Sequence, residues 1–124
     1  MKESFQELVE SLKKSRSTCP WTKSMTLEFM SKEILSEAKE IEEAVNKKDF
    51  ENVKEEVGDV LMDCLTLAII AEEHGYFTIK ESFEEVTKKL KRRKPWVFGD
   101  AKVETVEEAI AMWNAIKNKE KENI

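Results

Sequence analysis

Apolar residues recur every three or four positions along most of this chain, which is the pattern of amphipathic α-helices. The helix beginning near Phe50 is apolar almost all round from Val60 onward, which indicates a central helix packed on several sides. The pattern predicts five helices, at about 4–15, 27–45, 50–74, 78–94 and 105–116.

Polar residues at the predicted boundaries support these helices. Ser4, Thr78 and Thr105 are each followed three positions later by Glu, which is the capping-box pattern. Asp49 is placed to cap the third helix, and Gly75 to end it. The stretches "STCPWTKSM" and "PWVFGDAKVE" are interpreted as connecting loops.

The composition agrees with a helical protein. The 124 residues include only three Gly and two Pro, and 40% of residues are hydrophobic and 38% charged. A chain of this size forms one compact core. We therefore expect an all-α, five-helix single domain over residues 1–124 with a helical-bundle core and a frayed tail at about 117–124. The broad apolar faces of the later helices predict a homodimer.

The charge distribution bears on partners and location. The net charge of −5 argues against a general nucleic-acid partner. Cys19 and Cys64 are too few for a disulfide framework, which favours a reducing compartment. The longest apolar run is too short for a membrane span, and the first ten residues lack a signal-peptide core. We expect a cytoplasmic protein without a membrane partner.

Two pairs of carboxylates suggest a cation site. Glu37 and Glu40 in "SEAKEIEEAV", and Glu56 and Asp59 in "EEVGDV", are each three residues apart, so each pair lies on one side of its helix. If these consecutive helices are antiparallel, the pairs can face each other, and four like charges repel unless a cation lies among them. Oxygen ligands alone favour Mg²⁺. Asp63, one turn after Asp59, is a supporting partner or an additional ligand.

Each of these features also has a purely structural interpretation. An isolated E-x-x-E is most often a solvated helix face. A di-iron carboxylate bundle needs E-x-x-H motifs, and the single histidine, His74, lies at a helix end. In the basic block "KKLKRRK", Lys89 and Arg93 suit phosphate oxygens but also suit a solvated helix C-terminus. Trp113 is most simply a core residue, although its ring at an edge would stack on a base while Lys117 meets a phosphate.

Taken together, the motifs "CPWTKSMT", "SEAKEIEEAV", "KEEVGDVLMD", "AEEHGYF", "KKLKRRKPWVFGD" and "MWNAIK" make the chain similar to MazG-type nucleoside triphosphate pyrophosphohydrolases over nearly its whole length. This resemblance implies an all-helical, commonly dimeric enzyme that uses Mg²⁺, or Mn²⁺ as a substitute, to convert NTP or dNTP to the monophosphate and pyrophosphate. The implied residues are metal ligands Glu37, Glu40, Glu56 and Asp59, with Glu40 and Glu37 catalytic; substrate contacts Lys89, Arg93, Trp113 and Lys117; and supporting positions Lys54, Glu55 and Asp63.

The chain departs from the family pattern at three places. Ser36 stands where many members have Glu, Thr22 where they have Asp, and Lys94-Pro95-Trp96 where they have His-Pro-His. None of these changes removes an implied metal ligand. Two alternatives remain open: a pyrophosphohydrolase specific for one modified, deoxy or phosphoribosyl nucleotide, and a noncatalytic helical dimer that binds a cation or a protein partner.

Overall fold

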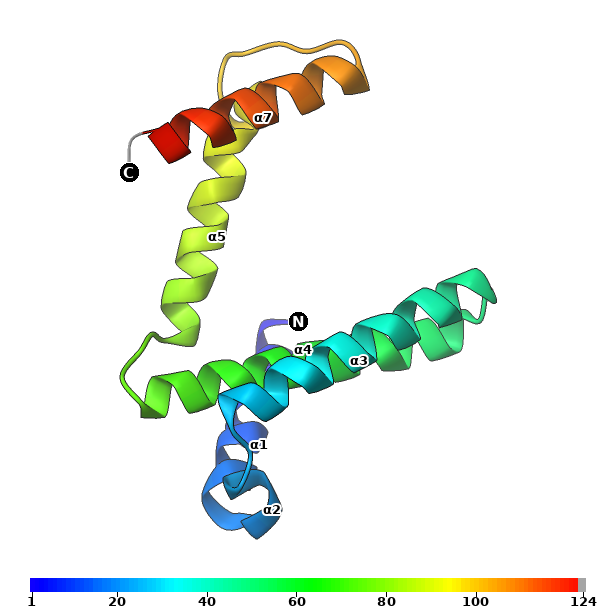
Figure 1. Ribbon diagram of the computed structural model, residues 1–124, viewed down its shortest axis with the longest axis vertical. Coiled ribbons are helices and arrows are strands. Elements are labelled where there is room, and N and C mark those ends of the chain that lie inside the picture. Colours follow the sequence, from blue (N-terminus) through cyan, green and yellow to red (C-terminus); the bar gives the residue numbers. More distant parts are fainter. Residues whose placement is uncertain (123–124) are drawn as a thin grey trace. The chain divides into compact units, whose positions relative to one another are not determined.

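The computed structural model describes residues 1–122, and within that range every regular element is an α-helix (Figure 1). None of the helices in this range is long and apolar enough to cross a membrane. The all-α prediction is confirmed, but the described residues form seven helices rather than five. They are α1 (Lys2–Thr18), α2 (Pro20–Lys23), α3 (Leu27–Asn46), α4 (Phe50–Glu73), α5 (Ile79–Arg93), α6 (Pro95–Phe98) and α7 (Val106–Glu122).

The two additional helices are the short α2 and α6, which lie where loops were expected. Each begins with proline at its first helical position. Proline favours this position because its φ angle is already helical and its missing N–H needs no partner. The N–H of Lys23 donates to the carbonyl of Cys19 at 2.9 Å, and the N–H of Phe98 donates to the carbonyl of Lys94 at 3.0 Å. In both cases a proline taken as a sign of a loop instead starts one helical turn.

The predicted helix caps are confirmed at two boundaries and wrong at one. The Asp49 carboxylate accepts a hydrogen bond from the N–H of Asn52 at 3.2 Å, and the Thr105 hydroxyl accepts one from the N–H of Glu108 at 3.1 Å. The capping box at Ser4 is wrong, because α1 already begins at Lys2 and has no side-chain cap.

Left-handed residues follow both long helices. Gly75 follows α4 with a φ of 75°, the conformation in which glycine is favoured as a helix stop. Lys48 has the same role after α3, with a φ of 56°. The next N–H, of Asp49, donates to the carbonyl of Ala44 at 3.1 Å and closes the turn. The chain therefore reverses within a few residues between α3 and α4.

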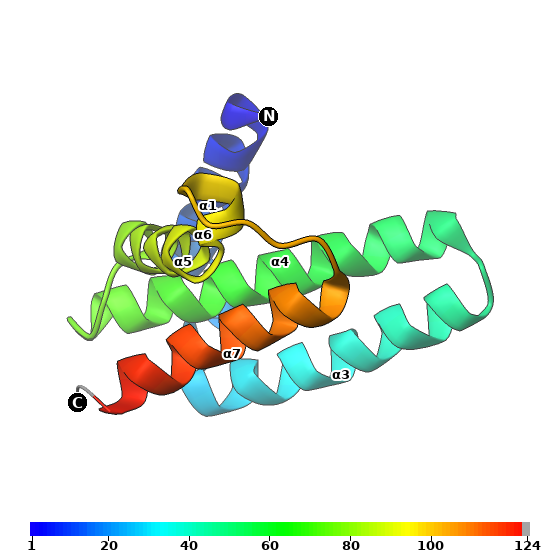
Figure 2. The same cartoon turned by 90° about the horizontal axis from the view of Figure 1, so that it is seen from above.

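The chain divides into two compact units, an N-terminal unit, Met1–Ile79, and a C-terminal unit from Lys80 onward. In the N-terminal unit, α3 and α4 lie side by side and antiparallel, and α1 packs against α4 (Figures 1 and 2). Met30 of α3 and Ile70 of α4 are its largest fully buried side chains. The predicted central helix is α4, whose buried residues concentrate between Leu65 and Ala71.

In the C-terminal unit, ion pairs join α5 to α7. The Glu120 carboxylate accepts from Nε of Arg92 at 2.6 Å and from Nη2 of Arg93 at 2.9 Å. These bonds lie beyond Lys117, where the tail was expected to begin, and α7 continues to Glu122. Residues 123–124 of the expected tail lie outside the described range.

Candidate active site

Three of the four predicted metal ligands converge between α3 and α4. Glu37 of α3 and Glu56 and Asp59 of α4 each place one carboxylate oxygen within 4.8 Å of the others. The spacing of three residues puts Glu56 and Asp59 on one side of α4, and the antiparallel pairing brings Glu37 opposite them. We call these three residues the acidic centre.

The acidic centre is partly removed from water. Glu56 is only 9% exposed, and its Oε2 and that of Glu37 are buried without a hydrogen-bond partner among the described residues. An unpaired buried carboxylate is costly, so it either binds a proton or a cation. The neighbouring carboxyl groups of Glu40 and Glu37, together with burial, raise the pKa of Glu56 to about 8. The donor set, all oxygen and anionic, fits a hard divalent cation such as Mg²⁺.

Opposing effects act on Glu37. The neighbouring Glu56 carboxyl acts to lower the pKa of Glu37, because a protonated Glu56 can donate to it. Burial and the charges of Glu40 and Asp59 outweigh this effect and raise the pKa. Glu40 is exposed and is not one of the three residues of the acidic centre, yet its charge raises the pKa of both Glu37 and Glu56. Its carboxylate is therefore close to the centre but faces water.

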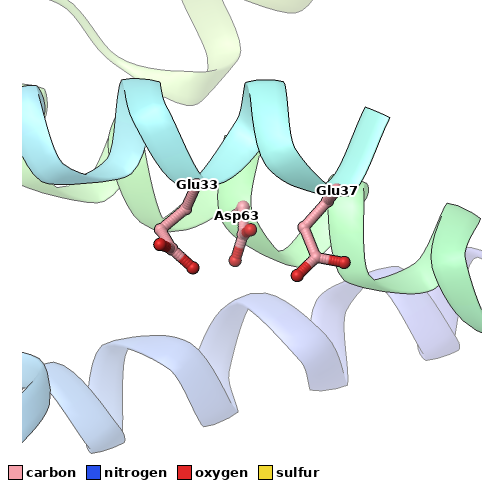
Figure 3. A group of neighbouring side chains, drawn as sticks. All are labelled: Glu33, Glu37 and Asp63. Atoms are coloured by element: carbon pink, nitrogen blue, oxygen red, sulfur yellow. The ribbon is translucent and has the colours of Figure 1, made fainter. Parts of the chain in front are cut away.

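A second carboxylate group shares Glu37. Oxygens of Glu33, Glu37 and Asp63 also lie within 4.8 Å of one another, and Figure 3 shows the three carboxyl groups pointing into the same space from α3 and α4. Burial, followed by the charges of Glu33 and Asp59, raises the pKa of Asp63. Sequence reasoning named Asp63 but missed Glu33, although Glu33 stands one helical turn before Glu37.

A cavity of about 360 Å³ adjoins both carboxylate groups. Glu33, Glu37, Asp59 and Asp63 contribute to its wall. Apolar side chains from α2, α3, α4 and the segment between α2 and α3 complete much of the lining, namely Trp21, Met25, Phe29, Met30 and Met62. The N-terminal unit thus places an apolar cavity next to the acidic centre.

The basic residues of α5 differ in their availability. Lys89 is exposed, as expected. Arg93 is not at a solvated helix end, because its side chain is only 15% exposed and its Nε and Nη2 both donate to Oε1 of Glu120, at 3.1 and 2.9 Å. Arg92 and Arg93 in turn lower the pKa of Glu120 to about 2. One carboxylate thus offsets part of the charge of two arginines.

Trp113 and Lys117 are half-buried on α7. The guanidinium carbon of Arg93 lies 5.2 Å from the centre of the Trp113 ring, within the range of a cation–π contact. Trp113 also lines a cavity of about 460 Å³ with Lys94, Trp96, Ala109 and Ile110. Stacking of a base on Trp113 stays a prediction.

The two remaining supporting positions, Lys54 and Glu55, are exposed on α4. Nζ of Lys54 pairs with Glu51 at 2.8 Å, a contact within one helical turn. Neither residue is part of the two carboxylate groups.

A known protein family matches the part of the chain that holds the two carboxylate groups. Residues 25–98 match the model of the MazG nucleotide pyrophosphohydrolase domain, which is more than half of the chain. The chain belongs to the MazG family. The matched range contains both carboxylate groups and α5 of this MazG domain.

Similar proteins cover nearly the whole chain. It is 38% identical to the "Nucleoside triphosphate pyrophosphohydrolase/pyrophosphatase MazG" of Thermotoga maritima, over 94% of this chain and 45% of that protein. It is 32% identical to the "Nucleoside triphosphate pyrophosphohydrolase" of Escherichia coli K12, over 92% of this chain and 43% of that protein. This MazG domain therefore spans less than half the length of these two curated relatives.

A solved structure has a similar fold. The mazG-related protein from Thermotoga maritima superposes with a TM-score of 0.80 at 33% identity, over 91% of this chain and 98% of that one. The similarity extends beyond the range matched by the family model.

Proposed function

We propose that this MazG domain is a Mg²⁺-dependent nucleoside triphosphate pyrophosphohydrolase, which converts NTP or dNTP and water to the monophosphate and pyrophosphate. The observation that carries this proposal is the acidic centre, in which two buried carboxylate oxygens have no hydrogen-bond partner among the described residues. The names of the relatives from Thermotoga maritima and Escherichia coli support the reaction class.

Glu37, Glu56 and Asp59 would hold the cation, and Glu40 would complete the ligand set from the water-facing side. When bound, Mg²⁺ supplies positive charge that offsets the negative charge on the phosphate oxygens. Mn²⁺ prefers similar ligands and would substitute. Asp63 borders this set, and exposed Lys54 and Glu55 flank it on α4.

We assign the proton transfer to Glu40, with Glu37 as its catalytic partner. A water oxygen attacks the α-phosphorus, the bond from that phosphorus to the oxygen bridging the β-phosphate breaks, and pyrophosphate leaves. The proton lost by the water passes to the Glu40 carboxylate, whose exposure leaves it accessible to water. Glu37 orients the water through its other carboxylate oxygen.

Lys89, Arg93 and Lys117 are the proposed phosphate contacts. Lys89 is exposed and supplies a point charge, while Arg93 keeps donors free beyond those bound by Glu120. Trp113 contributes by supporting the Arg93 guanidinium with its ring. Arg93→Ala and Lys89→Ala should each raise KM for triphosphates, and Lys89→Ala, at an exposed position, should leave the melting temperature nearly unchanged.

A homodimer is also proposed. Large apolar side chains are exposed along α3 and α4, with 67% exposure for Leu35, 68% for Phe50 and 55% for Leu61. Exposed apolar surface of this extent favours a protein interface. Sedimentation at micromolar concentration should show a dimer for the wild type and a monomer for Leu61→Lys. A wild-type monomer would count against it.

Product identification tests the proposed reaction. Purified protein is incubated with Mg²⁺ and a panel of ribo-, deoxy- and modified triphosphates, and products are separated by ion exchange. Monophosphate plus pyrophosphate supports the proposal, and hydrolysis of one panel member alone favours the narrowly specific alternative. Diphosphate plus phosphate contradicts it, and no turnover favours the noncatalytic dimer.

A further inference from the structure

The cavity beside the acidic centre has a lining suited to a flat ring. Trp21 is 71% exposed and Phe29 41% exposed, although both line a cavity whose deeper wall includes Met30, which is 2% exposed. Aromatic and thioether groups of this kind contact the face of a planar ligand well. The volume of about 360 Å³ is within the range of small-ligand pockets.

The position of the cavity favours a nucleotide as its occupant. Glu37 and Asp59 belong to the acidic centre and also line this cavity. If a cation in the acidic centre held the phosphates of a nucleotide, the rest of that nucleotide would lie next to the cavity. The part of a nucleotide that fits an apolar, aromatic-lined space is its base.

The charged groups of the cavity wall are carboxylates, which accept hydrogen bonds. The Ser15 and Thr22 hydroxyls bond to each other at 3.0 Å, and the Thr66 hydroxyl donates to the carbonyl of Met62 at 2.8 Å. The lining contains no Lys, Arg or His among the described residues. Glu33 and Asp63 supply carboxylate oxygens, so a ligand that bonds to these two residues must supply the donors.

We propose that this cavity binds the base of the substrate and that Glu33 and Asp63 select bases carrying an exocyclic amino group. This inference rests on the proposed function. Guanine is the best match, because its ring N–H and adjacent amino group offer two donors to the two oxygens of one carboxylate. Uracil and thymine present a carbonyl oxygen where cytosine presents the amino group, and a carboxylate repels that oxygen. Hypoxanthine lacks only the amino group of guanine.

A second cation is the competing occupant of the same carboxylates. Carboxylate oxygens of Glu33, Glu37 and Asp63 lie close enough to one another to bind a single cation. A cation there would change turnover for every base alike. Base binding by Glu33 and Asp63 would instead change the ratio of kcat/KM between two triphosphates whose bases differ in the exocyclic amino group.

The test compares kcat/KM for two pairs of triphosphates, GTP with ITP and CTP with UTP. Wild type should favour the amino-bearing member of each pair by about 10- to 100-fold, the effect of one hydrogen bond to a charged acceptor. Asp63→Asn and Glu33→Gln keep side-chain size but remove the charge, and should reduce these ratios to about 1 to 3. Glu42→Gln removes a charge from an exposed residue of α3 outside the cavity, and should leave them unchanged.

Three results would overturn the proposal. The first is a wild type that hydrolyses all four substrates with ratios near 1. The second is loss of one bound Mn²⁺ per chain in Asp63→Asn with unchanged ratios, which assigns the group to a second cation. The third is a tryptophan fluorescence change on GMP binding that survives Trp21→Phe and is lost in Trp113→Phe.

Failure of the proposed function gives a different result. If no triphosphate is hydrolysed, GMP and IMP affinities in the presence of Mg²⁺ are compared by the same fluorescence change. Tighter binding of GMP that depends on Asp63 and Trp21 supports the base site without the reaction. Equal affinities, or no binding of either, count against it.

Discussion

Binding of Mg²⁺ to this MazG domain should release about one proton near neutral pH. The pKa of Glu56 is raised to about 8 by Glu40, Glu37 and burial, so the metal-free protein holds a proton there. A cation needs the ionised carboxylate and therefore displaces that proton. The experiment adds Mg²⁺ to the metal-free protein at a series of pH values.

The magnitude follows from the pKa. With a pKa of about 8 for Glu56, the protonated form outnumbers the ionised form by about 30 to 1 at pH 6.5, and about one proton leaves on binding. At pH 9 the release falls to about 0.1 proton. The apparent Mg²⁺ affinity should therefore rise about tenfold per pH unit between roughly 5 and 8 and then level off.

The same proton makes the stability of the metal-free protein depend on pH. The folded state holds a proton on Glu56 up to about pH 8, whereas the unfolded state loses it near its ordinary pKa of about 4.3. The unfolded state thus binds fewer protons between these values, and stability falls as pH rises through that window. Saturating Mg²⁺ should remove this decline.

Isothermal titration calorimetry in two buffers with different ionisation enthalpies measures the released protons directly. Glu56→Gln cannot release this proton and should bind Mg²⁺ weakly. Glu55→Gln, a neighbouring exposed position outside both carboxylate groups, is the matched control and should keep the wild-type release. Tight Mg²⁺ binding at pH 6.5 without proton release would contradict a protonated Glu56 in the metal-free protein.

Three further substitutions test other parts of the structure. Mg²⁺ at 100 times its Kd should raise the wild-type melting temperature by about 10 °C. Glu37→Gln should gain much less from the same Mg²⁺ concentration and should lose turnover. Equal gains in the two proteins would show that Glu37 is not a metal ligand. A Cβ on Gly58 would have no neighbour within 4 Å. Gly58→Ala should therefore raise the free energy of unfolding in urea by about 1 kcal/mol. Loss of turnover in this stable variant would indicate that a ligand or a second chain approaches Gly58. Lys48 has a φ of 56°, so Lys48→Gly should stabilise by about 1 kcal/mol; a destabilised variant would contradict the strain at that turn.

Sequence periodicity predicted the five long helices because apolar residues recur at helical spacing within each of them, and this spacing is a local property of the sequence. The start of α1 was predicted too late, because Ser4 has the capping-box pattern but the helix already begins at Lys2. The short helices α2 and α6 have too few residues to show a period. Proline also has two local meanings, a loop residue or the first residue of a helix, and neighbouring residues do not decide between them.

The candidate site was predicted where its members share one helix. Glu56 and Asp59 are three residues apart, and their placement on one side of α4 follows from helix geometry alone. Glu33 was missed because its significance depends on Asp63, which belongs to a different helix. Pairing of Arg93 with Glu120 was likewise invisible, since the two residues are 27 positions apart.

Two glutamates show why position along the chain does not determine chemistry. Glu120 has a pKa lowered to about 2, chiefly by hydrogen bonds from Arg92 and Arg93, whereas Glu56 has a pKa raised to about 8 by Glu40, Glu37 and burial. The charge on Glu120 is neutralised within the fold. For Glu56, the surrounding groups that raise its pKa are other carboxyls, so residues 1–122 supply no cation to it and leave one of its oxygens without a partner. Glu120 is fully paired, whereas leaving the buried carboxyl of Glu56 unpaired lowers the stability of the fold. Binding of an external cation by Glu56 would remove this loss of stability.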